Sequence, residues 1–407
     1  LNMKQYRHEI VGLRALAILS VVLYHLNLTF FSQEFLPGGF LGVDIFFVIS
    51  GYLISKQILN EYVEYQSFSF VNFYLRRARR ILPVLFSVII IVAIFAYFVL
   101  YKPSDIENFS LSALLSVFFS SNFLFYSQFT DYFTQLESNV LLLHTWSLAV
   151  EEQFYIIFPL VFIFCLKFLK IKKTIIFIIF IALISLFLAE FISTRETVRF
   201  GRDVDINDMA IFGGAVTAGT FFTNSFSFYL LPARLWELLI GTLLVFIEKK
   251  FQISNKFNFL SYVGFLMIIL SFILINDNYN LPGLYTLIPL LGTSFIILTC
   301  NNKNLIKKTL SNKYIVFIGL ISYSLYLWHW PILILAQKYF SQVPHNNIIF
   351  NFSIFLISFL LSVVTYFMVE RPFRNKKQIS NKQFLWLISI ALSLILFICF
   401  KVFYINY

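Results

Sequence analysis

Charged residues are scarce in this sequence: Asp, Glu, Lys and Arg together make up only 13% of its 407 residues. A soluble enzyme of this length carries about twice that share on its surface, so the composition excludes an ordinary soluble protein. Hydrophobic residues instead make up 59% of the chain, with 53 phenylalanines among them. One soluble core cannot bury that much apolar surface, and the lipid bilayer is therefore the expected solvent.

Cysteine is nearly absent as well. Cys165, Cys300 and Cys399 fall in three separate apolar stretches, and none has a histidine at metal-ligand spacing. We therefore expect neither a disulfide nor a metal. The net charge of +11 comes from short basic clusters between apolar stretches, a pattern that indicates membrane topology and not nucleic-acid binding.

Apolar stretches near 20 residues in length, enough to cross a ~30 Å hydrocarbon layer, recur along the chain. We predict an all-α polytopic bundle of about eleven spans. With a cytoplasmic N-terminus and an extracytoplasmic C-terminus, most of the 31 Lys and Arg residues fall in inner segments, as the positive-inside rule requires. The spans are expected near residues 10–31, 38–59, 81–101, 147–166, 174–192, 228–247, 257–275, 283–300, 314–336, 348–369 and 384–400.

One apolar segment, residues 109–126, does not fit as a further crossing, because it would invert every later basic loop. We expect it to enter the membrane and return, which a backbone tolerates only where protein covers it or where it lines a wet cavity. Residues 109–146 would then shape an outward-facing vestibule. The longest predicted outer loop, residues 193–227, would lie over it.

The first two spans carry ionisable residues at bilayer depth, where a charge costs about 2.5–3.5 kcal/mol or more. Arg14 and His25 are about three helical turns apart and share one face of the first span. His25 and Asp44 are each expected about six residues from the outer end of their spans. Such an Asp would orient the imidazole for a base or an acyl carrier. The alternative, a buried polar pair that only fixes packing, stays open.

Further polar and aromatic residues are predicted at the same outer level, more than packing alone requires. We expect Glu151 and Glu152 to act with His25 and Asp44 in catalysis. Those expected to contact the substrate are His144, Trp146, Arg234, Glu237, Tyr326 and His329.

On the inner side, a cluster of arginines precedes the third predicted span. Their guanidinium groups, with that of Arg14, could bind the phosphates of a nucleotide-bearing donor in bidentate fashion. A lipid-headgroup anchor is the alternative, and spacing alone favours it. The cluster consists of Arg76, Arg77, Arg79 and Arg80.

Six motifs, in the expected order, resemble acyltransferase family 3, the polytopic membrane proteins that include bacterial O-antigen and peptidoglycan O-acetyltransferases. The resemblance covers nearly the whole chain. The motifs are Arg14 with His25 after ten residues, residues 38–52 (GGFLGVDIFFVISGY), 73–83 (FYLRRARRILP), 144–155 (HTWSLAVEEQFY), 321–331 (ISYSLYLWHWP) and 369–374 (VERPFR).

The resemblance implies that His25 is essential and that an Arg-x-x-Arg pair within residues 76–80 contacts acyl-CoA. Acetyl-CoA is the implied donor, with no metal. The implied acceptor is a surface glycan outside the bacterial inner membrane: lipopolysaccharide O-antigen, peptidoglycan or another exopolysaccharide. Residues 1–375 would form the acyltransferase domain. Residues 376–407 would add a span that in many relatives leads to an SGNH-hydrolase-like domain, which is not present within these 407 residues. We expect either that the sequence is truncated or that a partner supplies this domain.

A proton-coupled transporter of a small anion or of acyl groups is the main rival, because the same ionisable residues would suit a proton relay. The sequence shows no internal repeat, and arginines predicted inside with carboxylates outside favour an enzyme that meets different molecules at each face. A purely structural membrane scaffold is a third possible function. The density of intramembrane ionisable groups argues against it.

Overall fold

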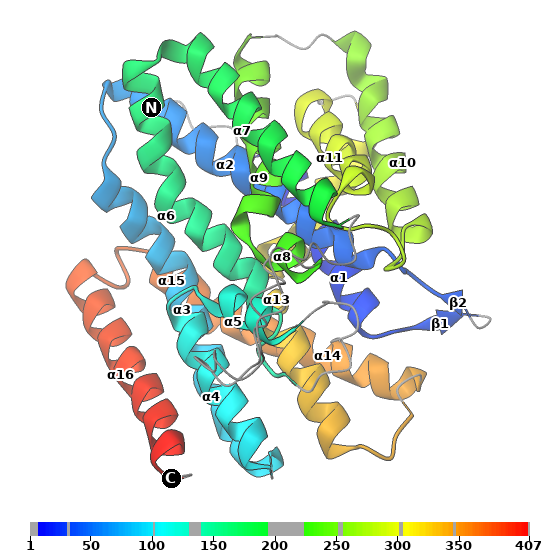
Figure 1. Cartoon of the computed structure of the whole chain (residues 1–407), viewed down its shortest axis with the longest axis vertical. Helices are drawn as coiled ribbons and strands as arrows, with labels where there is room; N and C mark the ends of the chain where they lie inside the picture. The colour runs from blue at the N-terminus through cyan, green and yellow to red at the C-terminus, as the bar shows by residue number, and fades with distance from the viewer. Residues whose placement is uncertain are drawn as a thin grey trace, which may run out of the picture.

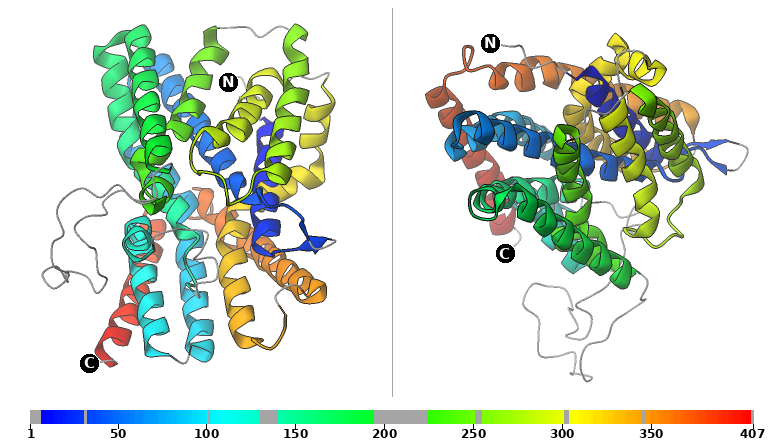
Figure 2. Two further views of the ribbon diagram at one scale, coloured as in Figure 1. Left: turned by 45° about the vertical axis from the view of Figure 1, so that its right-hand side comes forward. Right: turned by 90° about the horizontal axis from the view of Figure 1, so that it is seen from above.

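The computed structural model describes residues 7–30, 33–100, 102–129, 140–193, 224–250, 255–300, 304–344 and 347–405. These ranges are almost entirely helical (Figure 1). The exception is one antiparallel ladder between β1 (Thr29–Phe30) and β2 (Gln33–Glu34), which projects from the side of the bundle in both views of Figure 2. The predicted all-α class is confirmed.

A helix occupies each of the eleven stretches predicted to span. Eight helices in the described ranges are long and apolar enough to cross a membrane, so the chain is a multi-pass membrane protein; the number of crossings and their orientation stay predictions. The eleven helices are α1 (His8–His25), α2 (Gly42–Tyr65), α3 (Phe70–Val99), α6 (Thr145–Phe168), α7 (Lys170–Ser193), α9 (Leu231–Lys250), α10 (Phe259–Leu274), α11 (Leu287–Thr299), α13 (Lys313–Tyr339), α14 (Ile348–Thr365) and α16 (Asn381–Ile405).

Short helices join the long ones. Figure 1 shows α6 and α7 in the upper half of the molecule, and α4, α14 and α16 in the lower half. The short helices are α4 (Pro103–Val117), α5 (Ser121–Gln128), α8 (Asn224–Tyr229), α12 (Leu305–Leu310) and α15 (Arg371–Arg374).

Two predicted span ends were wrong in ways that affect the site. The first helix stops at His25, because Asn27 adopts a left-handed conformation with φ 46° and the chain then turns into β1. His25 is therefore the last residue of α1 and not six residues inside it. The third helix starts at Phe70, capped by the Ser69 side chain, which accepts a hydrogen bond from the backbone of Asn72. The arginine cluster consequently lies on a helical surface.

The segment predicted to be re-entrant is broken near its middle. Helix α4 ends at Val117, Phe119 has φ 54°, and α5 starts at Ser121. The depth of this helical pair in a membrane stays a prediction. Residues 130–139 of the expected vestibule and residues 194–223 of the expected outer loop lie outside the described residues.

Helices α2 and α9 pack with their backbones in contact. A Cβ on Gly51 would strike the carbonyl oxygen of Leu238, and one on Gly241 would strike that of Val48. Only glycine permits so close an approach, a common device where helices pack in membranes. Helices α1 and α13 meet in the same way, with Gly319 against the backbone of Val11. These two contacts fix the helix pairs that carry most of the predicted site.

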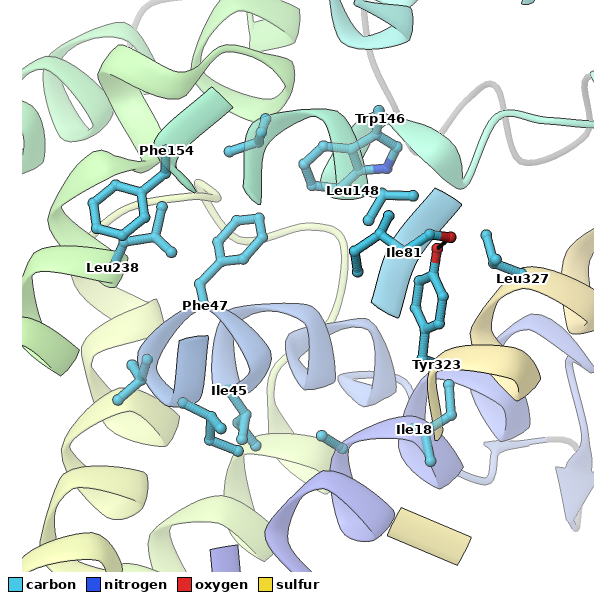
Figure 3. Close-up of a cluster of buried hydrophobic side chains, with 14 of the residues drawn as sticks. Ile18, Ile45, Phe47, Ile81, Trp146, Leu148, Phe154, Leu238, Tyr323 and Leu327 are labelled. Carbon is cyan, nitrogen blue, oxygen red and sulfur yellow. Dashed lines mark hydrogen bonds between the residues drawn. The ribbon is translucent and has the colours of Figure 1, made fainter. Parts of the chain in front are cut away.

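Aromatic and aliphatic side chains fill the centre where α2, α3, α6 and α13 meet. Figure 3 shows Phe47 facing Trp146, whose ring it meets edge-on at 6.5 Å between centroids. In the same view Tyr323 reaches Ile81, whose backbone oxygen accepts a hydrogen bond from the tyrosine hydroxyl at 3.0 Å. The core therefore joins α13 to α3 directly beneath the residues of the site.

A charged cluster joins the N-terminal end of α1 to α2, α9 and α11. The Arg7 guanidinium donates to Glu9 at 2.6 Å, to the Tyr52 hydroxyl at 2.8 Å and to the backbone oxygen of Ile297 at 2.6 Å. Burial opposes the charge of Arg7, but Tyr52, Glu9 and Glu248 outweigh burial and raise its pKa. The cluster therefore joins these four helices through ion pairs of Arg7 with Glu9 and Glu248 and through hydrogen bonds.

Candidate active site

His25 lies against the second half of α13. Its Nδ1 is 3.1 Å from Nε2 of His329, and the two imidazole rings are close to parallel, with an interplanar angle of 22°. The Trp330 ring meets His25 edge-on at 4.9 Å between centroids. The two histidines meet because α1 and α13 run parallel, in contact from Val11 and Gly319 at one end to the histidine pair at the other.

The segment before α6 is attached to the same part of α13. The Trp330 indole donates a hydrogen bond to the backbone oxygen of Val140 at 2.8 Å, and the Tyr326 hydroxyl donates to that of His144 at 2.7 Å. The His144 ring therefore packs against His329, 5.6 Å between centroids. Three histidines from three segments thus gather here, as the sequence could not show.

His144 is almost completely buried, and neither of its ring nitrogens has a hydrogen-bond partner within 3.5 Å among the described residues. A buried polar group is normally paired, so each exception in a native structure needs an explanation. A ligand that hydrogen-bonds this imidazole would supply one.

Asp44 does not contact His25, and the predicted pair is wrong. The Arg234 guanidinium donates to Asp44 at 2.7 Å and to Glu237 at 2.9 Å, and all three side chains are at most 4% exposed. Arg234 also donates to the backbone oxygen of Phe228 at 3.0 Å. Asp44 is in the first turn of α2 and faces α9, so the packing of those helices decides its partner.

Trp146 belongs to this ion-pair group as well. The guanidinium of Arg234 lies over its ring at 5.4 Å from the centroid, and Phe228 packs on it at 4.7 Å between centroids. Trp146, Arg234 and Glu237 were predicted to contact the substrate, but none of them lines the cleft described next.

A cleft runs between α1, α2, α3, α6 and α13 and encloses about 760 Å³, including the part open to the surface. Three guanidinium groups and one carboxylate line it together with several hydroxyl groups. Tyr326 lines the cleft and packs against His329, 5.3 Å between ring centroids, so the cleft reaches to within one side chain of the histidine pair. Its polar lining residues are Arg14, Ser50, Arg77, Arg80, Ser147, Glu151, Tyr155, Ser322, Tyr323 and Tyr326.

The arginine cluster divides between two faces of α3. Arg77 and Arg80 are three residues apart, so they share the face that lines the cleft. Arg76 is exposed and pairs with Glu61 at 3.1 Å. Arg79 is buried on the opposite side, where it donates to the Phe373 backbone oxygen at 2.9 Å and so ties α3 to the chain before α16. Of the five arginines predicted to contact the donor, Arg14, Arg77 and Arg80 line the cleft.

Glu151 lies in the same cleft as the arginines and not on a separate outer level. Its Oε1 accepts a hydrogen bond from Ser50 at 2.8 Å, and its Oε2 accepts one from Tyr155 at 3.4 Å. Glu152, next to it, is 5% exposed, and its Oε1 has no hydrogen-bond partner in the described part of the chain. Helix α6 starts beside the histidines, so six further residues carry its glutamates toward the arginine end. The predicted division of arginines and carboxylates between two faces is therefore wrong.

Sequence reasoning missed several hydroxyl groups of the cleft. The Ser147 hydroxyl is 2.7 Å from that of Tyr326, and Ser50 and Tyr155 fix Glu151. All of these residues lie inside the motifs quoted above, and that position could have indicated them. The sequence around a single hydroxyl residue does not indicate which group it contacts.

The arrangement can bind an anion and move a proton. Guanidinium groups converge on one end of the cleft, and imidazoles lie beyond the other end, which suits a phosphate-bearing molecule whose reactive end points toward the histidines. Among the described residues, no three His, Cys, Asp or Glu side chains converge as metal ligands would.

Comparison with known proteins places this chain among acyltransferases. A family model described as an acyltransferase domain matches residues 7–367. Over an aligned length of 389 residues, 91% of this chain, the sequence is 34% identical to O-acetyltransferase OatA of Staphylococcus aureus strain NCTC 8325 / PS 47. It is 32% identical, over the same length, to the putative O-acetyltransferase SAS0844 of S. aureus strain MSSA476. The chain spans 58% of the length of each of these relatives. No solved structure matches it.

Proposed function

Because this chain belongs to the acyltransferase family whose model covers nearly its whole length, we propose that it is a membrane O-acyltransferase. It moves an acyl group, acetyl in the simplest case, from acyl-CoA on the basic, cytoplasmic side to a hydroxyl group of a surface glycan outside a bacterial inner membrane. The observation that carries the proposal is the cleft that contains three guanidinium groups and reaches to Tyr326, one side chain short of the histidines around His25.

The donor end of the cleft suits the phosphates of coenzyme A. Arg14 and Arg80 make no hydrogen bond or ion pair with any described residue. Arg77 donates one hydrogen bond, to Gln57 at 3.1 Å, and its Nε has no partner in the described ranges. A cation inside a membrane protein normally has a partner, and phosphate oxygens would supply bidentate ones here. Acetyl-CoA as donor follows from this chemistry together with the family.

The reacting end of the cleft suits acyl transfer. In a direct route the acceptor oxygen bonds to the thioester carbonyl carbon while Nε2 of His25 takes the hydroxyl proton. The carbon–sulfur bond breaks, and the leaving thiolate takes that proton from the imidazolium, giving an ester and a thiol. In a covalent route Nε2 attacks the carbonyl carbon first, the thiolate leaves, and the hydroxyl then displaces the imidazole, its proton ending on the thiolate. Both routes need the thioester to pass Tyr326.

The acceptor side of the proposal rests on the relatives. Their printed names are O-acetyltransferases, and the chain spans little more than half of their length. In the proposal the described part delivers the acyl group across the membrane, and an SGNH-type domain or protein completes its transfer to the glycan. In the proposal His144, whose ring packs against that of His329 at 5.6 Å between centroids, contacts the accepting hydroxyl compound.

The test is transfer of labelled acetyl from acetyl-CoA by the purified protein in lipid vesicles. Wild type should hydrolyse the donor or acetylate added glycan, with peptidoglycan and lipopolysaccharide as the acceptors tried. His25→Ala should abolish both, whereas His8→Ala, at the other end of the same helix, should retain them. Full acetyl turnover by His25→Ala would contradict the proposal.

The same vesicles test the transporter alternative. A proton-coupled carrier of a small anion such as acetate would take up the labelled anion, with no cleavage of the thioester and no labelled glycan. That outcome would contradict the acyltransferase proposal and support the transporter.

A further inference from the structure

Nδ1 of His25 contacts an imidazole, and this contact determines which nitrogen of His25 carries a proton. Nδ1 of His329 lies 2.6 Å from the backbone oxygen of Tyr326, one turn earlier in the same helix. A carbonyl oxygen can only accept, so Nδ1 of His329 must carry the hydrogen of that bond. The acceptor oxygen is a backbone atom of α13, the helix that also carries His329.

The tautomer of the second ring follows from the first. In a neutral imidazole one nitrogen is a donor and the other an acceptor, so Nε2 of His329 carries a lone pair. The bond at 3.1 Å between Nε2 of His329 and Nδ1 of His25 therefore has His25 as its donor. With both rings neutral, the hydrogen of His25 is on Nδ1, and the basic lone pair is on Nε2.

We propose that His329 is a positioning residue that holds His25 in its Nδ1–H tautomer and so makes Nε2 the atom that accepts the proton or the acyl group. This inference rests on the proposed acyl transfer and adds a role that neither the motifs nor the relatives assign. His329 takes the place predicted for Asp44, whose carboxylate is instead bound to Arg234.

A neutral acceptor can serve in that place because the bond to His329 strengthens when His25 becomes charged. Once Nε2 takes a proton, the Nδ1–H of an imidazolium donates to His329, and hydrogen bonds from ionised donors are about twice as strong as neutral ones. In a Ser-His-Asp triad a carboxylate fixes the ring in this way. The buried position of His329, 3% exposed, keeps water from competing for the bond.

The same geometry shows that His329 orients the base and does not pass its proton on. A relay would need a proton acceptor beyond His329, but its Nδ1 already donates to the oxygen of Tyr326. A proton taken by His25 therefore stays on that ring until the departing thiolate collects it. Base and acid roles thus fall to one atom, Nε2 of His25.

Nitrogen-15 labelling of histidine tests the tautomer without any measurement of activity. The sequence holds only five histidines, so each ring can be assigned by substitution in the protein reconstituted in lipid. In wild type the His25 ring should show a protonated Nδ1 and an unprotonated Nε2. In His329→Leu, which cannot accept a hydrogen bond, the Nε2–H form should appear. A wild-type His25 protonated at Nε2 would overturn the inference.

Kinetics then separate positioning from mere packing. The side-chain oxygen of a glutamine can occupy the place of Nε2, so His329→Gln should keep kcat within about threefold of wild type. His329→Leu should lose about tenfold or more, the equivalent of one lost hydrogen bond of about 1.4 kcal/mol. The KM for acetyl-CoA should stay unchanged in both, because the arginines of the cleft are untouched. Equal loss in the Leu and Gln variants would overturn the role of His329.

The two proposals fail in different ways. If His25→Ala keeps full transfer while wild-type His25 shows the Nδ1–H form, the function is wrong and the tautomer assignment stands. If His25→Ala is inactive but His329→Leu behaves as wild type in both spectra and kinetics, the function stands and the positioning role is wrong. Should His329→Leu not fold, the wild-type spectrum and His329→Gln still decide the matter.

Discussion

Arg234 donates a hydrogen bond to Asp44 across the interface of α9 and α2 at 2.7 Å, and both side chains are 4% exposed. Asp44 lies in a stretch where a catalytic acid was expected, yet its carboxylate serves to join two helices. The close contact at Gly51 and Gly241 brings the helices near enough for the pair to form. A motif residue thus stabilises the scaffold of the site, and the histidines of α1 and α13 remain the chemical groups.

We predict that Arg234→Ala destabilises the protein by about 3–5 kcal/mol, because it leaves two buried carboxylates without their cation. Thermal unfolding in detergent should show a clearly lowered midpoint. Arg76→Ala, which removes an exposed pair with Glu61, is the matched control and should change stability by about 1 kcal/mol or less. An Arg234→Ala protein as stable as the control would refute the structural role given to the pair.

Donor affinity should depend on which face of α3 an arginine occupies. Arg80→Gln removes a guanidinium from the cleft and should raise the Kd for acetyl-CoA about tenfold or more, since hydrogen bonds to charged groups contribute about 1.5–3 kcal/mol. Arg76→Gln, one turn away on the exposed face, should leave the Kd unchanged. Calorimetric titration of the purified variants measures both. If the Arg80→Gln and Arg76→Gln variants bind acetyl-CoA with equal affinity, the arginine cluster is a lipid-headgroup anchor and not a donor site.

Gly51→Ala should separate α2 from α9. The added Cβ has no space beside the carbonyl oxygen of Leu238, and overpacking of this kind costs about 1–3 kcal/mol. We expect a lowered unfolding midpoint, with Val364→Leu on the exposed side of α14 as a control that leaves it unchanged. A midpoint equal to that of wild type would mean that the helices do not approach as closely as described.

Tyr326→Phe should slow transfer without weakening donor binding. The Tyr326 hydroxyl donates to the backbone oxygen of His144 and therefore accepts from Ser147, so its loss leaves two groups unsatisfied at a cost of about 1–3 kcal/mol. The kcat should fall about tenfold while the Kd for acetyl-CoA is retained. Tyr314→Phe, 69% exposed at the start of the same helix, should behave as wild type. A fall in affinity with an unchanged kcat would contradict this assignment.

Hydropathy was sufficient to find the helices, because a stretch of about 20 apolar residues has few alternatives to a helix in a bilayer. It did not find their ends: the left-handed Asn27 that stops α1 and the Ser69 cap that starts α3 are local backbone events. Helical periodicity separates Arg79 from Arg77 and Arg80, but it places Arg76 one turn from Arg80 and so cannot tell these two apart. The positions of the neighbouring helices were needed to show which face of α3 lines the cleft.

The amino-acid sequence by itself determined that this protein lies in a membrane, that it is helical and which family it belongs to, because the lengths of apolar stretches and the spacings of motifs are read along a single chain. The tertiary structure alone decided the partners. Asp44 is 19 residues from His25 along the chain, and His329 is 304 residues from it. The packing of α1 on α13 nevertheless pairs His25 with His329, and the packing of α2 on α9 pairs Asp44 with Arg234. A hydrogen bond depends on distance and direction in space, and neither can be read along the chain.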